Sequence, residues 1–270
     1  MQRRIIALTA VVAAVVVVAA GCSSSKNAPS SPPASPGADG TTPGTAISGT
    51  VTVFAAASLK EAFTTLAKQF ETGHPGSHVK LSFGASSDLA EQINQGAPAD
   101  VFASASPKNM QQVISAGGAA TSTNFAKNVM EVAVPPSNPA QVGSVADLAK
   151  SSVKVALCQP QVPCGTVAAE VFNNAKITVK PVTLEPDVKS TLSKVELNEV
   201  DAGMVYVTDV RAAGSKVKGI VIPDNINAST EYPIAALTKA PHATGAQAFV
   251  DLVLSPAGQS VLTADGFQKP

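Results

Sequence analysis

The chain is poor in charge and in aromatic side chains, and it has no tryptophan. Of its 270 residues, 14% are Asp, Glu, Lys or Arg and 4% are aromatic, and the formal net charge is zero. Binding to the phosphates of nucleic acid requires a basic field, so nucleic acid is not expected as a partner. Sites that stack sugars or bases need aromatic rings, so a small polar ligand fits this composition better.

Histidine and cysteine are also scarce, with three of each. His74, His78 and His242 are far apart in the sequence and lack the spacing of zinc ligands, so neither a bare metal cation nor a cofactor is expected. Cys158 and Cys164 form a C-x5-C pair. In an exported chain two such thiols usually form a disulfide, and closing so short a loop would contribute about 2 kcal/mol in the chain-entropy model. Metal binding by this pair is the weaker alternative.

The third cysteine follows a pattern typical of an export signal. Arg3 and Arg4 make the first four residues basic, Ile5–Ala20 are apolar except for Thr9, and small residues precede Cys22. This predicts that residues 1–22 are a lipoprotein signal with Cys22 as the lipidation site. An ordinary signal peptide or a transmembrane anchor is the alternative, and every case places the body outside the cytoplasm. Lipid on Cys22 would hold it at the extracytoplasmic face of the cell membrane. Residues 23–47 are rich in Ser, Pro, Gly, Ala and Thr and are expected to form a disordered tether.

The rest of the chain, about 220 residues, is long enough for one large domain or two compact lobes. Apolar strand-like runs alternate with segments of helical spacing, which favours an α/β fold. The expected strands are 51–57, 79–83, 100–104, 128–134, 153–157, 177–184, 202–207, 220–223 and 232–237. The expected helices begin at 59 and near 88 and then span 107–116, 144–150, 166–175, 188–198 and 246–254.

Two strands in the first part of this pattern end at serines that precede a helix. Ser58 closes one apolar strand, and Ser86 follows the next. Because the first turn of a helix has unpaired N–H groups and the positive end of the helix dipole, each junction can bind an anion. The alternative is that the serines only cap their helices, since Ser58 and Glu61 have capping-box spacing. The recurrence suggests one shared crevice at the carboxyl ends of the strands.

Four motifs together resemble a known family. These are Val53-Phe-Ala-Ala-Ala-Ser-Leu59, Phe83-Gly-Ala-Ser-Ser87, Gly96-Ala-Pro-Ala-Asp-Val-Phe102 and Glu231-Tyr-Pro233. From about Ser48 to Phe267 the chain resembles the periplasmic molybdate-binding proteins, the substrate-binding components of bacterial molybdate ABC transporters. The resemblance implies a two-lobed type II periplasmic-binding fold, with lobe one formed by residues 48–133 and 232–270 and lobe two by 134–231. The chain would then cross between the lobes near Val134 and near Glu231.

The resemblance also implies a function and a ligand set. The protein would be a monomeric receptor, not an enzyme, that captures molybdate or tungstate and delivers it to the permease and ATPase of an ABC importer. Ser58 and Ser86 would donate hydroxyl and backbone hydrogen bonds, Cys164 and Val188 would donate backbone N–H groups, and Tyr206 would donate its hydroxyl. The family usually has alanine at the position of Cys164, so its side-chain surroundings differ here. A tyrosine in an apolar strand can instead be a core residue with its hydroxyl already bonded.

Such a donor set contains no Lys or Arg. It would suit a fully deprotonated tetrahedral oxyanion and would penalise hydrogen phosphate, whose proton needs an acceptor. Sulfate is smaller than molybdate and would be reached poorly by the donors.

Two alternatives to a molybdate receptor stay open. One is a receptor for another oxyanion such as sulfate. The other is a thiol-dependent hydrolase with Cys164 as the nucleophile at a helix N-terminus, although no histidine lies near a comparable junction to act as its base.

Overall fold

The computed structural model describes residues 47–270. The predicted signal segment, the lipidation site Cys22 and all but the last residue of the predicted tether lie outside these residues. Within 47–270, no helix is both long and apolar enough to cross a membrane.

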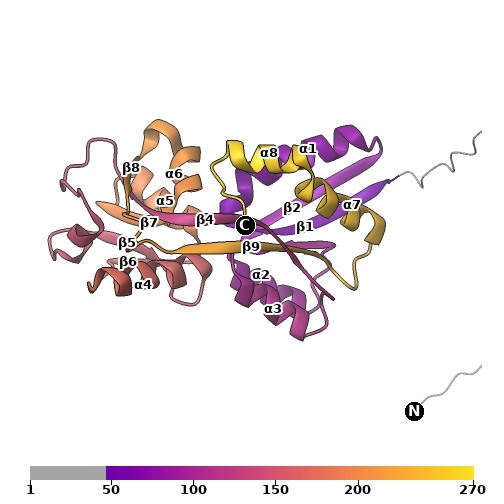
Figure 1. Cartoon of the computed structure of the whole chain (residues 1–270), viewed down its shortest axis with the longest axis horizontal. Helices are drawn as coiled ribbons and strands as arrows, with labels where there is room; N and C mark the ends of the chain where they lie inside the picture. Colours follow the sequence, from indigo (N-terminus) through magenta and orange to yellow (C-terminus); the bar gives the residue numbers. More distant parts are fainter. Residues whose placement is uncertain (1–46) are drawn as a thin grey trace, which may run out of the picture. The chain divides into compact units, whose positions relative to one another are not determined.

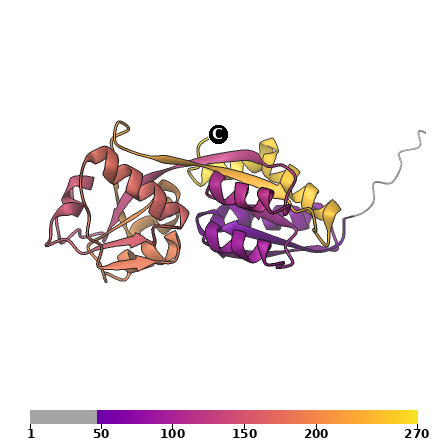
Figure 2. The ribbon, with the colours of Figure 1, turned by 90° about the horizontal axis from the view of Figure 1, so that it is seen from below.

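Two lobes are joined by long extended strands (Figures 1 and 2). The strands follow one hydrogen-bonded path in the order β2-β1-β3-β9-β4-β7-β5-β6, and β8 pairs with β4 at one side of this path. Lobe one contains strands β1 (Gly49–Ala56), β2 (Ser77–Gly84), β3 (Val101–Ala103), β9 (Ser229–Ala236) and the first part of β4 (Thr123–Val134). Its helices are α1 (Lys60–Gly73), α2 (Ser86–Asn94), α3 (Pro107–Ser115), α7 (Ala243–Leu254), α8 (Pro256–Ala264) and the short 3-10 turn η1 (Ala57–Leu59).

The lobe-one sheet is covered on both faces. Helices α1, α7 and α8 lie over one face, and α2 and α3 lie over the other (Figure 1). Successive residues of a strand point to opposite faces, and β1 follows this rule. Val53 and Ala55 pack in one core with Phe63 and Phe249, whereas Phe54 packs in the second core below α2 and α3. Because β1 runs parallel to both β2 and β3, the carboxyl ends of all three strands meet at one edge.

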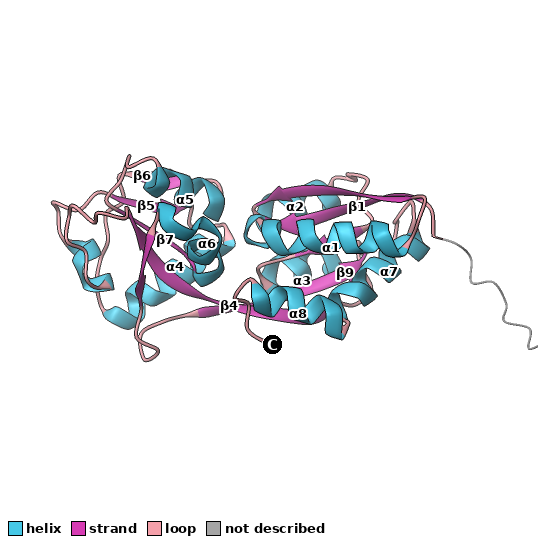
Figure 3. Ribbon diagram, turned by 90° about the horizontal axis from the view of Figure 1, so that it is seen from above, coloured by secondary structure: helices cyan, strands magenta, loops and turns pink. Residues whose placement is uncertain are grey.

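Lobe two repeats this arrangement with fewer elements. Its strands are the second part of β4, β5 (Val155–Cys158), β6 (Thr183–Glu185), β7 (Ala202–Tyr206) and β8 (Lys218–Val221). Its helices are α4 (Pro163–Ala175), α5 (Val188–Glu196), α6 (Val207–Ala213) and the 3-10 turns η2 (Val145–Ala149) and η3 (Gly214–Lys216). Strand β5 lies parallel to β6 and β7, so their carboxyl ends also share an edge, with the helices packed around the sheet (Figure 3).

Strand β4 belongs to both lobes. It pairs with β9 as far as Val129, with β7 from Met130 onward and with β8 from Glu131 onward. The family resemblance implies a first crossing near Val134, four residues later. We propose that the boundary between the lobes lies at Val129–Met130, inside one continuous strand.

Several elements differ from those expected from the sequence. Helix α4 begins at Pro163 rather than at Thr166, and α8, which begins at Pro256, is not among the expected helices. Proline is favoured at the first helical position, because its missing N–H would have no partner there, so both starts carry a recognisable signal. The expected strand 177–184 is reduced to the three residues of β6.

Candidate functional site: a small cavity between the lobes

A small cavity lies where the carboxyl ends of the parallel strands of the two lobes face each other. It is lined by Ala56, Ala57, Ser58, Gly84, Ala85, Ser86, Ala105, Pro163, Cys164, Asp187, Val188 and Tyr206. Its volume, measured as the space open to the centre of a water-sized sphere, is about 20 Å³. One buried water needs roughly 10–15 Å³ on the same measure, so the cavity suits a very small ligand. All five predicted ligand residues line it, and each is at most 4% exposed to solvent.

In lobe one, both serines lie at helix starts without capping them. The N-cap residues of α1 and α2 are Leu59 and Ala85, and neither helix has a side-chain cap. The interpretation of Ser58 and Ser86 as caps is therefore wrong. The Ser58 hydroxyl lies 2.9 Å from the hydroxyl of Tyr232, and the Ser86 hydroxyl accepts a 2.9 Å hydrogen bond from the backbone N–H of Ala105.

In lobe two, two further helices begin at the cavity. Val188 is the first residue of α5, and Cys164 is in the first turn of α4. Backbone N–H groups in a first turn have no partner within their helix. Asp187 is the only residue lining this cavity that carries a formal charge. Its carboxylate caps α5 by accepting a 2.9 Å hydrogen bond from the N–H of Ser190.

Tyr206 ends β7 with its hydroxyl in the protein interior. The side chain is 1% exposed, and the hydroxyl has no hydrogen-bond partner within residues 47–270. Burial, reinforced by Tyr232 and Asp209, raises the pKa of Tyr206 well above its ordinary value, so the group stays a neutral donor. The alternative of a core tyrosine with a bonded hydroxyl is therefore wrong. An unpaired buried hydroxyl beside a cavity is suited to donate to a ligand.

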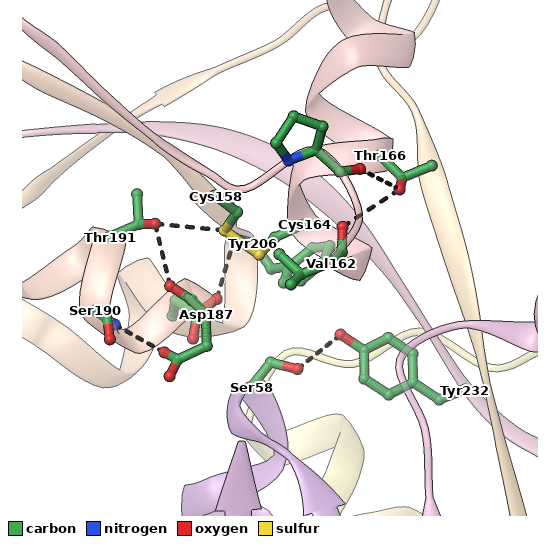
Figure 4. The surroundings of a disulfide bond; sticks show 12 residues. Ser58, Cys158, Val162, Cys164, Thr166, Asp187, Ser190, Thr191, Tyr206 and Tyr232 are labelled. Carbon is green, nitrogen blue, oxygen red and sulfur yellow. Dashed lines mark hydrogen bonds between the residues drawn. A yellow bond between two sulfur atoms is a disulfide. The ribbon is translucent and has the colours of Figure 1, made fainter. Parts of the chain in front are cut away.

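Cys158 and Cys164 form a disulfide that links the end of β5 to the start of α4 (Figure 4). The Cys158 sulfur also lies 3.3 Å from the hydroxyl of Thr191 in α5. Because the Cys164 sulfur is in a disulfide, it is not available as a nucleophile, and only the backbone N–H of this residue can serve the cavity. The hydrolase alternative loses its nucleophile.

Tyr232 also contributes to the site, although its sequence surroundings do not indicate a functional role. Tyr232 of β9 holds the Ser58 hydroxyl, as Figure 4 shows. The amide nitrogen of Asn128 in β4 donates to the Thr208 hydroxyl at 2.8 Å and lies 3.5 Å from the Tyr232 hydroxyl. The Glu231-Tyr-Pro233 motif marks this segment, but nothing local in the sequence indicates that Tyr232 contacts a residue 174 positions away.

The electrostatic character of the cavity follows from these groups. Four helix starts converge on a space lined by no Lys and no Arg, and the hydroxyls and N–H groups around it are donors. Helix N-termini favour negative charge, so the arrangement can hold a small anion without a cation from the protein. Among residues 47–270, no group of three or more His, Cys, Asp or Glu is placed to bind a metal ion.

Comparison with known proteins agrees with this geometry. Residues 51–268 match the model of a family described as bacterial extracellular solute-binding protein. The chain belongs to this family. The molybdate-binding protein ModA of Mycobacterium tuberculosis strain H37Rv is 40% identical to this solute-binding protein over 245 residues, which are 90% of the chain and 91% of the relative. Members of the family bind solutes for transport, so this chain is a solute-binding protein and not an enzyme.

Solved structures show the same fold. The periplasmic molybdate-binding protein of Azotobacter vinelandii aligns with a TM-score of 0.72 at 22% identity, over 82% of this solute-binding protein and 99% of that chain. The sulfate-binding protein SubI of M. tuberculosis H37Rv aligns with a TM-score of 0.70 at 18% identity, over 82% and 86%. The expected two-lobed α/β fold of periplasmic binding proteins is confirmed.

Proposed function

We propose that this solute-binding protein captures molybdate, and also tungstate, in the interlobe cavity and delivers it to the permease and ATPase of an ABC importer. The name and the 40% identity of the mycobacterial relative support molybdate as the solute. The similarity to the sulfate-binding protein, at 18% identity, concerns the fold alone.

The observation that carries the proposal is the set of donors around the cavity. Ser58 and Ser86 offer N–H and hydroxyl groups, Cys164 and Val188 offer N–H groups, and Tyr206 offers a hydroxyl without another partner. Each charge-assisted hydrogen bond of this kind contributes about 1.5–3 kcal/mol. Several such bonds from buried residues around one small cavity are sufficient to bind a dianion tightly.

The same donors account for selectivity. Hydrogen phosphate carries a proton that needs an acceptor, and the ligand donors offer none; the one carboxylate that lines the cavity, Asp187, already accepts from the N–H of Ser190. Sulfate carries the same charge as molybdate but is smaller, so a cavity fitted to molybdate leaves some donors too far from its oxygens. Molybdate and tungstate are nearly equal in size, so both are expected to bind. No cofactor is required.

The proposal extends to the segment before the described residues. Cys22 follows an apolar run and small residues, which supports lipid attachment and retention at the extracytoplasmic face of the cell membrane. Since a single acyl chain binds a membrane only marginally, we propose that several acyl chains anchor a monomeric protein there.

Calorimetry with a panel of oxyanions tests the function. The protein without residues 1–22 should bind one molybdate or tungstate per chain, with affinities far above those for sulfate and phosphate. Equal affinity for sulfate and molybdate would contradict the size argument and favour a sulfate receptor.

A further inference from the structure

Beside the uncharged donors of the cavity lies an ion triad that crosses between the lobes. Lys189 follows Val188 in α5 of lobe two. Its ammonium nitrogen lies 2.8 Å from Glu61 Oε2 in α1 of lobe one and 3.1 Å from Asp209 Oδ1 in α6 of lobe two. Lys189 therefore bridges one carboxylate of each lobe.

The lobe-two half of the triad is deeply buried. The side chain of Asp209 is 0% exposed, and that of Lys189 is 21% exposed. Burial raises the pKa of Asp209, while the ammonium of Lys189 opposes that rise. Burial lowers the pKa of Lys189, but the charges of Asp209 and Glu61 outweigh it and leave this pKa above its ordinary value. A buried carboxylate of this kind depends on its partner, because an unpaired charge in the interior is costly.

Each member of the triad is tied to a residue of the cavity. The second carboxylate oxygen of Asp209 accepts a 3.1 Å hydrogen bond from the backbone N–H of Tyr206. Lys189 is next to Val188, and Glu61 is one helical turn after Ser58. The triad thus connects three segments that present donors to the cavity. The segments of Val188 and Tyr206 belong to lobe two, and the segment of Ser58 belongs to lobe one.

We propose that Glu61, Lys189 and Asp209 form a closure latch that positions the start of α5 and Tyr206 against lobe one. The inference rests on the proposed function, since it concerns how the same cavity holds its anion. The residues act through others and do not touch the ligand. The Glu61–Lys189 contact joins the lobes, so it must break whenever they separate, and its loss should favour the open form and faster release of the anion. The Lys189–Asp209 contact stays within lobe two and holds its donors in place.

The test uses Glu61→Gln, which removes the charge attraction between the lobes at a partly exposed side chain and keeps the size of that side chain. Lys194→Met is the matched control, because Lys194 lies on the same helix and pairs at 2.6 Å with Glu199 inside lobe two. Calorimetry and stopped-flow release of molybdate should show a Kd raised about three- to tenfold for Glu61→Gln, mainly through faster dissociation, as for one partly buried ion pair. Lys194→Met should match the unchanged protein.

A second pair of variants separates the latch from folding. Lys189→Met leaves the Asp209 charge buried without a partner and can destabilise lobe two. Lys189→Met/Asp209→Asn removes that charge as well, and it should fold yet release molybdate faster than the unchanged protein. Small-angle scattering without ligand should show Glu61→Gln more open than the unchanged protein and than Lys194→Met.

The outcomes distinguish the latch from the proposed function. If the unchanged protein fails to bind molybdate, the proposed function is wrong, and the scattering comparison alone decides on the latch. If it binds but Glu61→Gln has the same dissociation rate and the same scattering as Lys194→Met, the latch is overturned and the triad is only structural.

Discussion

The two lobes present helix starts to the cavity in the same way, but they hold their donor side chains differently. In lobe one the hydroxyls of Ser58 and Ser86 already bond to Tyr232 and to the backbone of Ala105. In lobe two the Tyr206 hydroxyl has no partner within the described residues, and Val188 has no side-chain donor at all. Under the proposed function, the lobe-one serines therefore serve both folding and anion binding, whereas the lobe-two donors serve anion binding.

This difference predicts how each lobe responds to substitution. Changes to lobe-two donors should reduce affinity with little effect on the unliganded protein. Changes to lobe-one donors should reduce both the affinity and the stability of the unliganded protein, because a buried hydrogen-bond partner is left unsatisfied.

The largest effect is expected at the start of α5. Val188→Pro removes the N–H expected to bind the anion while the helix keeps its start, because proline is favoured at this position and Asp187 already has the extended backbone that precedes a proline. Molybdate affinity should fall about tenfold to hundredfold, the range for one charge-assisted hydrogen bond. Val188→Ala, which keeps the N–H, is the control in the same calorimetric titration. Equal losses in the two variants would show that side-chain packing, not the N–H, is what matters.

Tyr206→Phe should separate binding from stability. It removes a hydroxyl that has no partner in the protein, so the free energy of unfolding of the unliganded protein should be unchanged or slightly higher, while affinity falls about tenfold. Tyr232→Phe is the matched control, because its hydroxyl is bonded to Ser58 and its loss should lower stability. Urea unfolding and calorimetry measure the two effects. A Tyr206→Phe variant with unchanged affinity would remove this hydroxyl from the ligand set.

Ser58→Ala and Ser86→Ala should each lower both molybdate affinity and the stability of the unliganded protein. Affinity should fall about tenfold, the lower end of the range for one charge-assisted hydrogen bond, because the backbone N–H of each residue stays in place. The free energy of unfolding should fall by about 1 kcal/mol or more, because Tyr232 or the Ala105 N–H loses its partner. The same two measurements apply. Lower stability with wild-type affinity would mean that the serines are only structural.

The strand-to-helix junctions of both lobes can be predicted from the sequence, but the residues that contact them cannot. Strand-to-helix junctions at Ser58, Ser86 and Val188 are visible because apolar periodicity and turn residues are local signals. The partner of Ser58 is Tyr232, which lies in a different part of the chain and joins it only through the sheet order. The same holds for Lys189 and Glu61, whose contact depends on how the two lobes meet.

The boundary between the lobes and the start of α4 are hard to predict for a related reason. Strand β4 continues through the crossing between the lobes, so the hydrophobic pattern does not change where its partner strand changes. Helix α4 begins before Cys164, so the backbone position of this residue follows from Pro163 rather than from the apolar pattern behind it. That Ser58, Ser86, Cys164, Val188 and Tyr206 bind the anion stays a prediction, although the structure brings all five to one cavity.

The smallest effect on molybdate affinity is expected from reducing the disulfide of lobe two. Reduction of Cys158–Cys164 should loosen the start of α4 and increase the entropy lost when the Cys164 N–H binds the anion. Affinity should fall by about tenfold or less, because the other donors stay in place, and stability should fall by about 2 kcal/mol, the chain-entropy value for so short a loop. Thiol titration of the unreduced, denatured protein lacking Cys22 checks the bridge, and calorimetry before and after reduction checks the effect. Two free thiols would contradict the bridge, and unchanged affinity after complete reduction would limit it to a role in stability.

The position of the bound anion tests the account most directly. Crystals grown with tungstate should give one strong anomalous peak from tungsten in the cavity. The tungstate oxygens should lie within hydrogen-bonding distance of Ser58 and Ser86 of lobe one and of Cys164, Val188 and Tyr206 of lobe two. A peak elsewhere on the molecule, or an empty cavity at saturating tungstate, would contradict the proposed site.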